Sequence, residues 1–283
     1  MNARAIHRVR LADGSKRVAI GPPGAPTDLL GPEASIDGLL GAGAAAVRGV
    51  GDLAAEPLVG AFDLLVPIGS QPVWASGVTY LRSREAREEE SDTPDHYERV
   101  YDAERPELFL KALPGNAVGP GEAVGVRADS GWDVPEPELC IVVDPTGTIC
   151  ALTIGNDVSS RSIEGENPLY LPQAKSYRRS CAIGPALVPV DDDWAYEHLR
   201  IELDVVRDSR SIFRDAISMS EMKRSPHELA PWLVRCQDMP MGAVLLTGTG
   251  IVPPPSFTLT AGDEVDIAIT GLGHLWNPVV EVA

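Results

Sequence analysis

Three acids are the residues whose types and spacing best suit chemistry. Glu136 and Glu138 alternate with prolines at the start of the apolar run DVPEPELCIVV, and Asp157 follows a second apolar run, TICALTI. Converging carboxylates repel one another unless a cation lies between them, and oxygen ligands suit a hard cation such as Mg²⁺. We interpret the three acids as a divalent-metal site. The alternative is that Glu136 and Glu138 are solvated acids at a strand edge.

The two apolar runs are predicted to form a hairpin that brings these acids together. The tetrapeptide DPTG, which begins at Asp144, has Asp, Pro and Gly at the positions that a type I turn favours. If Asp144 pairs with Gly147, Val134 pairs with Asp157, and side-chain alternation puts the three acids on one face. Glu136 and Asp157 are then diagonal neighbours, roughly 5 to 8 Å apart. A β-bulge would change this register.

The rest of the chain predicts a mainly β fold with some α. Residues 1–65 mix short apolar runs with Gly and Ala and indicate a small N-terminal α+β subdomain. Residues 66–283 contain short β-rich runs separated by Pro, Gly and Asp, and are predicted to form one catalytic domain. Helical periodicity is confined to pieces such as YLRSREAREEE and SPHELAPWLVRCQ. The acidic run from Arg84 to Asp92 is interpreted as a solvated helix end or a mobile lid.

Composition narrows the classes of partner. The chain has 283 residues with 41 acids against 24 bases, a net charge of −17, which repels nucleic acid and anionic membrane surfaces. A small anionic substrate is still compatible with this charge if a metal ion reverses the local field. The sequence has no run of 18 apolar residues and no apolar signal-peptide core, so we expect a cytoplasmic protein. Its four cysteines lack CxxC spacing, which argues against a zinc site or disulfide framework.

Longer stretches resemble a known family. DVPEPELCIVV and LTIGNDVSSRSIEGENPLYLPQAKSYRRSCAIGPAL are similar to the fumarylacetoacetate hydrolase family, and the resemblance runs from about Val73 to the end. It implies a mixed β-sandwich or roll catalytic domain in which Glu136, Glu138 and Asp157 hold Mg²⁺, with Mn²⁺ or Ca²⁺ as substitutes. Lys175 in QAKSY matches a lysine of the family motif. The resemblance also implies a homodimer or homotetramer.

One departure from the family pattern indicates the type of reaction. Many hydrolases of the family carry GxNYxxHxxE, whose histidine helps to activate water, whereas this chain reads GVTYLRSREAR with Ser83 and Ala86 at those positions. A hydrolase would therefore lack its usual base. GVTYLRS, RPELFLKA and GENPLYLPQAKSY together resemble the branch of sugar-acid dehydratases that acts on 2-keto-3-deoxy-D-pentonates.

The resemblance assigns roles to four further residues. Glu107 in RPE and Lys175 are the implied catalytic pair. Thr249 in LLTGTG is implied to meet the substrate carboxylate, and Lys175 and Arg82 are further candidates for binding the substrate. Each of these residues also has an ordinary structural interpretation: Glu107 as a surface acid, Lys175 as a solvated lysine, Thr249 as a turn residue and Arg82 as a surface residue on a helix.

The implied reaction is metal-dependent dehydration of 2-keto-3-deoxy-D-pentonate to 2,5-dioxopentanoate, in oxidative breakdown of D-xylose or D-arabinose. A divalent metal bound to the small anionic 2-keto acid would acidify its C3 protons, one of which Glu107 or Lys175 removes. The alternatives are an acylpyruvate hydrolase or oxaloacetate decarboxylase of the same family, or a non-catalytic metal-binding relative. D-Xylonate and D-arabinonate give the same 2-keto-3-deoxy acid, so the sequence does not distinguish the two sugars.

Overall fold

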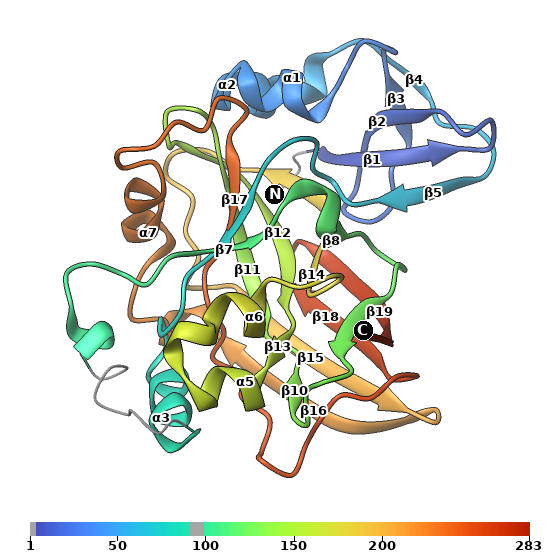
Figure 1. Cartoon of the computed structure of the whole chain (residues 1–283). Helices are drawn as coiled ribbons and strands as arrows, with labels where there is room; N and C mark the ends of the chain where they lie inside the picture. The colour runs from blue at the N-terminus through green and yellow to red at the C-terminus, as the bar shows by residue number, and fades with distance from the viewer. Residues whose placement is uncertain (1–3, 91–98) are drawn as a thin grey trace.

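Two large β-sheets make up most of the molecule, which confirms the predicted mainly β fold with some α (Figure 1). The computed structural model describes residues 4–90 and 99–283. Both helical pieces expected from the sequence are helices, α3 (Leu81–Glu90) and α7 (Pro226–Leu233). The acidic run from Arg84 therefore enters α3, and its last two residues, 91 and 92, lie outside the described residues.

The larger sheet joins strands from most of the chain. Its main path runs in the order β4 (Ala55–Pro57), β3 (Asp28–Leu30), β2 (Lys16–Gly21), β1 (Ala5–Leu11), β14 (Cys181–Pro189), β12 (Ile149–Asp157), β11 (Pro137–Val143), β17 (Ala243–Leu246), β6 (Val73–Ala75) and β7 (Phe109–Ala112). Off this path, β5 (Phe62–Leu65) pairs with β1, and β8 (Ala117–Val118) pairs with β14. The near-continuous apolar sequences of β11 and β12 are typical of strands buried on both faces, and every residue of both strands is buried.

The smaller sheet lies across the core from β11 and β12. Its order is β16 (Arg210–Ser218), β15 (Arg200–Arg207), β18 (Glu264–Ile269), β19 (Gly273–Val282) and β9 (Val124–Arg127). Buried and more accessible residues alternate along β15 and β18, because one face packs on the core and the other faces water. A separate two-stranded ladder joins β10 (Asp133–Val134) to β13 (Ser159–Ser160).

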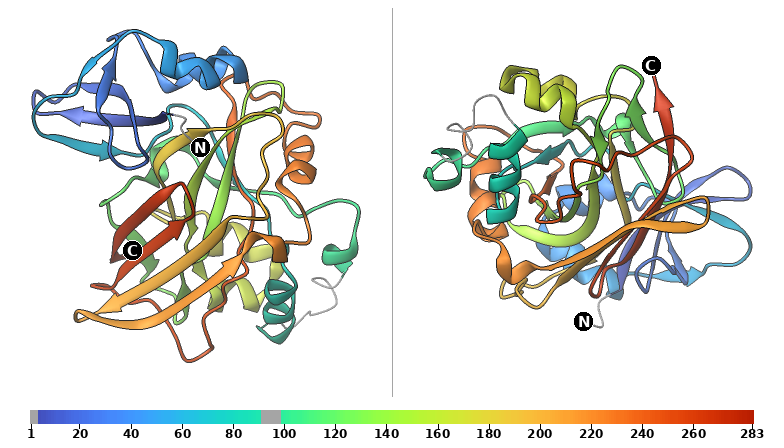
Figure 2. Two further views of the ribbon diagram at one scale, coloured as in Figure 1. Left: turned by 180° about the vertical axis from the view of Figure 1, so that it is seen from behind. Right: turned by 90° about the horizontal axis from the view of Figure 1, so that it is seen from below.

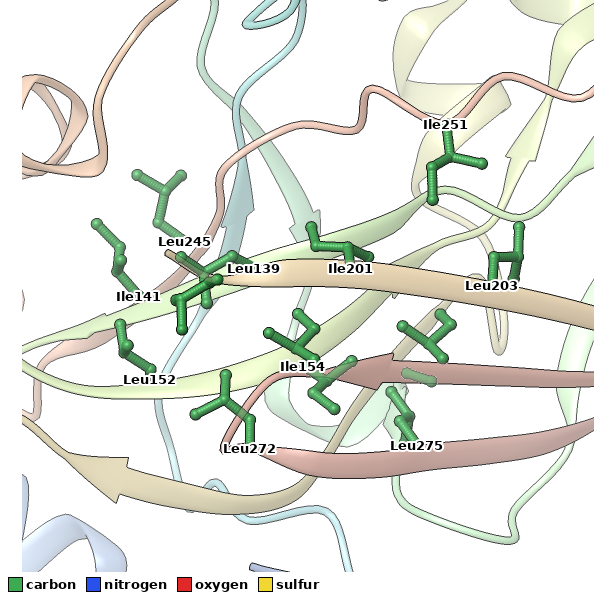
Figure 3. Packing of buried hydrophobic residues seen from close by; sticks show 14 of the residues in the cluster. Leu139, Ile141, Leu152, Ile154, Ile201, Leu203, Leu245, Ile251, Leu272 and Leu275 are labelled. Atoms are coloured by element: carbon green, nitrogen blue, oxygen red, sulfur yellow. The ribbon is translucent and has the colours of Figure 1, made fainter. Parts of the chain in front are cut away.

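The main apolar core fills the space between the two sheets (Figure 3). Leu139 of β11 and Ile154 of β12 belong to the same cluster as Ile201 of β15 and Leu275 of β19. Each is no more than 1% exposed. Burying a large aliphatic side chain contributes about 1.5–3 kcal/mol, so this cluster fixes how the strands are stacked.

A second apolar cluster covers the opposite face of the larger sheet. Cys140 and Val142 of β11 point to it, and it includes Leu40 of α1 (Ile36–Gly41) and Val47 of α2 (Ala44–Arg48). Further short helical elements include η1 (Gly49–Asp52), η2 (Pro114–Asn116), α5 (Arg161–Glu166), η3 (Pro168–Tyr170), α6 (Leu171–Lys175) and η4 (Met219–Glu221). Within the described ranges, no helix combines the length and apolarity that crossing a membrane requires.

The N-terminal elements gather at one end of the molecule. Figures 1 and 2 show β1 to β5 with α1 and α2, in blue, beside the rest of the chain. They are not detached, because Ile6 of β1 pairs with Leu187 of β14 and so extends the larger sheet. The division into residues 1–65 and 66–283 stays a prediction.

The hairpin of β11 and β12 forms, but its register differs from the predicted one. Gly147 N donates to Asp144 O at 2.9 Å, as expected for the turn, while Asp144 N donates to Thr148 O at 3.0 Å and lengthens the loop. The ladder also shifts between Val142 and Val143. Val134 consequently pairs with Ser159 rather than with Asp157. The predicted register was wrong by two residues, and a shift of two keeps every side chain on its original face.

Candidate active site

The hairpin places the three acids beside one another in the interior. Glu136 immediately precedes β11, Glu138 lies within that strand, and Asp157 ends β12. Asp157 N donates to Glu136 O at 2.9 Å, so these two residues are cross-strand neighbours rather than diagonal ones. One carboxylate oxygen from each acid lies within 4.8 Å of the others, and all three residues are buried. The structure thus brings together the predicted metal ligands.

The electrostatics of this carboxylate triad, Glu136, Glu138 and Asp157, favour a bound cation. Burial, followed by the negative charges of Asp157 and Glu136, raises the pKa of Glu138 well above its usual value. Gly248 N donates to Glu138 Oε2 at 2.5 Å, which opposes that rise. In the described part of the chain, no cationic side chain forms an ion pair with Glu138. Three buried carboxylates, one of them without a positive partner, match the oxygen donors that Mg²⁺ or Ca²⁺ prefers.

Lys175 ends α6 with its ammonium group against two acids of the triad. Lys175 Nζ donates to Glu136 Oε1 at 2.8 Å, to Asp157 Oδ2 at 3.4 Å and to Ser159 Oγ at 2.6 Å. The residue is only 2% exposed, so the solvated-lysine interpretation does not describe it. The structure therefore places Lys175 next to the triad, and its catalytic role stays a prediction.

A second buried lysine, Lys111 of β7, was missed by the sequence analysis. Its Nζ lies 2.5 Å from Asp157 Oδ1 and donates to Val158 O at 2.9 Å. It also donates to the backbone carbonyl of Lys175 and so ties the end of α6 to the strand. Lys111 is fully buried. The feature of the sequence that could have identified it is a lone lysine inside the apolar run LFLKAL. A lysine within an apolar run is not explained as an ordinary solvated side chain.

Helix α5 adds a third cation that the sequence analysis did not single out. Arg161 lies 3.2 Å from Glu136 Oε1 and 3.9 Å from Glu164 Oε2, and all three residues are buried. Ser160 caps α5 by accepting a hydrogen bond from Ile163 N, which fixes the start of the helix beside β12. The cations therefore gather on the Glu136 and Asp157 side of the triad, away from Glu138.

A cavity opens beside the triad and collects most of the predicted site residues. It is lined by Ser76, Gly77, Val78, Ser83, Glu107, Phe109, Glu136, Asp157, Glu164, Lys175, Gly248 and Thr249. Glu107 is half-buried, so it is not the fully solvated surface acid of the alternative interpretation. Thr249 is 3% exposed, and its Oγ1 accepts a hydrogen bond from Ile251 N at 3.2 Å. The hydroxyl also donates to Ile251 O at 3.4 Å, so both bonds fit a turn residue, while the residue as a whole lines the cavity.

The start of α3 gives two further results. Arg82 is exposed, lies 4.0 Å from Glu85 and is not among the cavity-lining residues, so the structure does not bring it to the site. Ser83, which replaces the histidine of the hydrolase motif, is buried and donates to Tyr80 O at 2.9 Å. Among the residues that the structure describes, none of the histidines lines the cavity.

Comparison with known proteins identifies the class of this fold and site. Residues 73–280 match the family described as fumarylacetoacetate (FAA) hydrolase C-terminal. The match covers well over half of the chain, and the chain belongs to the fumarylacetoacetate hydrolase family.

Individual relatives carry more specific names. The probable 2-keto-3-deoxyxylonate dehydratase of Haloferax volcanii is 54% identical over 217 residues, which are 77% of this chain and 75% of that protein. The 2-dehydro-3-deoxy-D-arabinonate dehydratase of Saccharolobus solfataricus is 44% identical over 217 residues, 75% of this chain and 73% of that protein. A solved structure of 2-keto-3-deoxy-D-arabinonate dehydratase complexed with magnesium and 2,5-dioxopentanoate has a TM-score of 0.84 at 34% identity, covering 98% of this chain and 99% of that one.

Proposed function

We propose that the protein is a metal-dependent hydro-lyase that dehydrates 2-keto-3-deoxy-D-pentonate to 2,5-dioxopentanoate. The observation that carries the proposal is one cavity lined by Glu107, Lys175 and two acids of the buried triad, with no histidine among its described lining residues. The three relatives reported above support it, since each is named as a dehydratase of such a 2-keto-3-deoxy acid. The chain lacks the histidine that the hydrolase motif uses to activate water.

In this proposal Glu136, Glu138 and Asp157 hold Mg²⁺, for which Mn²⁺ or Ca²⁺ can substitute. Bound Mg²⁺ would withdraw electron density from the oxygens of a 2-keto acid and so acidify its C3 protons. The buried side chains around the triad exclude bulk water, which strengthens every electrostatic interaction there. Lys111 and Arg161 hold Asp157 and Glu136 in place, because each cation contacts one of those carboxylates.

We assign different proton-transfer roles to Glu107 and Lys175. Lys175 lines the cavity with its ammonium group on Glu136, Asp157 and Ser159, so it serves as the cation there, and it donates one proton to the departing C4 hydroxyl in exchange for one of these hydrogen bonds. Glu107, which also lines the cavity, serves as the base that removes a C3 proton. Loss of this proton and of C4 hydroxide, protonated to water, leaves a C3–C4 double bond. A C5 proton then moves to C3 and leaves a C4–C5 enol, which becomes the aldehyde when its hydroxyl proton is lost and C4 is protonated.

Thr249 is proposed to contact the substrate carboxylate, because it lines the cavity beside Gly248. The substrate-binding role of Arg82 stays a prediction, since its exposed side chain lies on the outer surface of α3. Homodimer or homotetramer formation and a role in pentose breakdown rest on the family resemblance, and a cytoplasmic location rests on the sequence expectation given above. Light scattering on the purified protein would measure the oligomeric state.

A substrate panel tests the reaction class. The purified protein with Mg²⁺ is incubated separately with 2-keto-3-deoxy-D-pentonate, an acylpyruvate and oxaloacetate, and the products are identified by ¹³C NMR. We expect loss of one water from the first substrate and a single five-carbon product. Cleavage of the acylpyruvate, or CO₂ release from oxaloacetate, at a higher kcat/KM than the dehydration would replace the proposal with a hydrolase or a decarboxylase.

A further inference from the structure

The carboxylate of Glu107 lies directly against the backbone of Gly77. A Cβ atom at position 77 would stand 2.1 Å from Glu107 Oε2 and 2.9 Å from its Cδ, closer than real side-chain atoms approach one another. Gly77 is not among the glycines with positive φ, so an alanine would not strain the backbone there. The requirement for glycine at this position is therefore one of space, and Glu107 occupies that space.

The backbone on either side of Gly77 is held in place. Ser76 N donates to Leu246 O at 2.9 Å, and Thr79 Oγ1 donates to Thr247 O at 2.7 Å. Lys223 N donates to Thr79 O at 2.9 Å from a third segment. Val78 has a φ of 55°, which a β-branched residue adopts only where its surroundings impose it. The turn of residues 76–79 consequently has little freedom to move away from an added methyl group.

The backbone that carries Glu107 is also held on both sides. Two residues later, Phe109 pairs with Ala75 in the ladder of β6 and β7. On the other side, the buried Arg224 donates to Glu104 O at 3.4 Å and to Val100 O at 3.0 Å. With both backbones held, the Glu107 side chain is the part that moves if space at position 77 is lost.

The same turn is also packed against the metal end of the site. Gly248, whose N–H donates to Glu138, has a φ of +96°, and a Cβ there would stand 2.0 Å from Thr79 Oγ1. The turn of residues 76–79 thus lies between the segment that holds Glu138 and the Glu107 carboxylate. Close backbone approach on both sides sets the spacing between that carboxylate and the triad.

We propose that Gly77 is a positioning residue that sets the location of the Glu107 carboxylate relative to the carboxylate triad. This inference rests on the proposed function, in which Glu107 is the base. An alanine at position 77 pushes the carboxylate away by about the length of a bond, and misplacement of a catalytic group by about 1 Å lowers turnover by about 10²-fold. Metal binding is retained, because the atoms nearest to the added methyl group all belong to Glu107 rather than to a metal ligand.

The test compares Gly77→Ala with Gly115→Ala in full-length protein loaded with Mg²⁺. Gly115 is exposed, has no positive φ and has no atom within 4 Å of an added Cβ, so its replacement controls for loss of glycine alone. For G77A we expect kcat to fall by about 10²-fold, with KM within about threefold of wild type and an unchanged Mg²⁺-induced rise in melting temperature. A kcat within twofold of wild type would overturn the inference. A melting temperature well below that of G115A, or a loss of the Mg²⁺ response, would also overturn it by showing a structural role.

A crystal structure of G77A separates this inference from the proposed function. Movement of Glu107 Oε2 by about 1 Å or more, with the triad in place, supports the positioning role even if the wild type fails to turn over the pentonate. An unmoved carboxylate contradicts the positioning role whatever the substrate is. Absence of wild-type turnover, by contrast, counts only against the reaction proposed above.

Discussion

One face of β11 has an apolar half and a charged half. Val142 and Cys140 point into the cluster that includes α1, whereas Glu138 and Glu136, farther back along the same side of the chain, belong to the carboxylate triad, of which Glu136 lines the cavity. Strand alternation puts all four side chains on one face. Their position along the chain determines whether they pack in the apolar core or belong to the candidate active site. The strand is continuous from Glu138 to Val142, so the difference between the two halves lies in what packs against each.

The two halves contribute oppositely to stability. In the apolar half, each buried large side chain stabilises the fold by about 1.5–3 kcal/mol. In the charged half, burial disfavours the ionised form of Glu138, and the neighbouring acids add repulsion. Such clustering of buried charge is typical of functional sites, where stability is given up for reactivity. Variants in the charged half are therefore expected to change turnover, and variants in the apolar half to change stability.

The largest effect is expected from neutralising a triad acid with an isosteric amide. Glu136→Gln or Asp157→Asn should lower kcat by on the order of 10³-fold or more, because a metal ion contributes several kcal/mol to transition-state stabilisation. Both variants should also lose the rise in melting temperature that Mg²⁺ produces in the wild type. Full activity in both variants would show that the reaction does not depend on a metal bound by these acids.

The next effect is expected at Lys175. Lys175→Met removes the ammonium group but keeps much of the side-chain volume, so we expect kcat to fall by about 10²–10³-fold. Mg²⁺ should still raise the melting temperature, since the three carboxylates remain. Thermal-shift measurements alongside steady-state kinetics make this distinction, and undiminished turnover would exclude Lys175 from the mechanism.

The apolar half provides the contrasting variant. Leu40 of α1 is 1% exposed and belongs to the cluster that Cys140 and Val142 complete. Leu40→Ala should lower the free energy of unfolding by about 2–5 kcal/mol, as large-to-small core substitutions do. Its kcat, measured well below its melting temperature, should match that of the wild type. A large loss of kcat in the folded variant would show that the two halves are not separable.

The smallest effect concerns stability against pH in the N-terminal region. His7 of β1 is fully buried, its Nε2 accepts a hydrogen bond from Gly24 N at 3.0 Å, and burial lowers its pKa from 6.5 to about 4. The unfolded chain therefore binds more protons than the folded chain between about pH 4 and pH 6.5. The His7 contribution to stability is present above that window and is lost as pH falls through it, by up to about 3 kcal/mol.

The glutamine variant isolates this histidine contribution. Urea unfolding of wild type and His7→Gln at several pH values should show a smaller loss of stability with falling pH in the variant. The carboxylates are the same in both proteins, so the difference reports His7. Identical pH dependences would rule out the neutral buried histidine.

The sequence predicted the acids and the mainly β fold because both depend on local patterns. Apolar runs on either side of an Asp-Pro-Thr-Gly turn indicate a hairpin, and alternation then puts Glu136, Glu138 and Asp157 on one face. The register was wrong because the shift at Val142 and the longer loop to Thr148 leave no clear signal in the sequence. The error of two residues preserved the face, which is why the carboxylates still meet.

The residues that were missed depend on contacts between distant segments. Lys111 reaches Asp157 only because β7 lies alongside the end of α6, 64 residues away in sequence. The requirement for glycine at position 77 follows from where Glu107 lies, 30 residues further along the chain. No local sequence period or motif indicates either of these contacts. Arg82 shows the converse, because its place in a motif did not bring its side chain to the cavity.

The central claim is that the carboxylate triad binds the metal that dehydration requires, and Glu138→Gln tests it most directly. Wild type and variant are stripped with EDTA, exchanged into metal-free buffer and titrated with Mg²⁺, while 2,5-dioxopentanoate formation is followed through NAD(P)⁺ reduction by an added aldehyde dehydrogenase. We expect stripped wild type to be inactive and to regain turnover with Mg²⁺, and the variant to stay inactive. The metal-free melting temperature of the variant is also expected to be higher, because the cost of burying a carboxyl group beside two other carboxylates is removed. Full turnover by the stripped wild type, or a wild-type response of the variant to Mg²⁺, would contradict the claim.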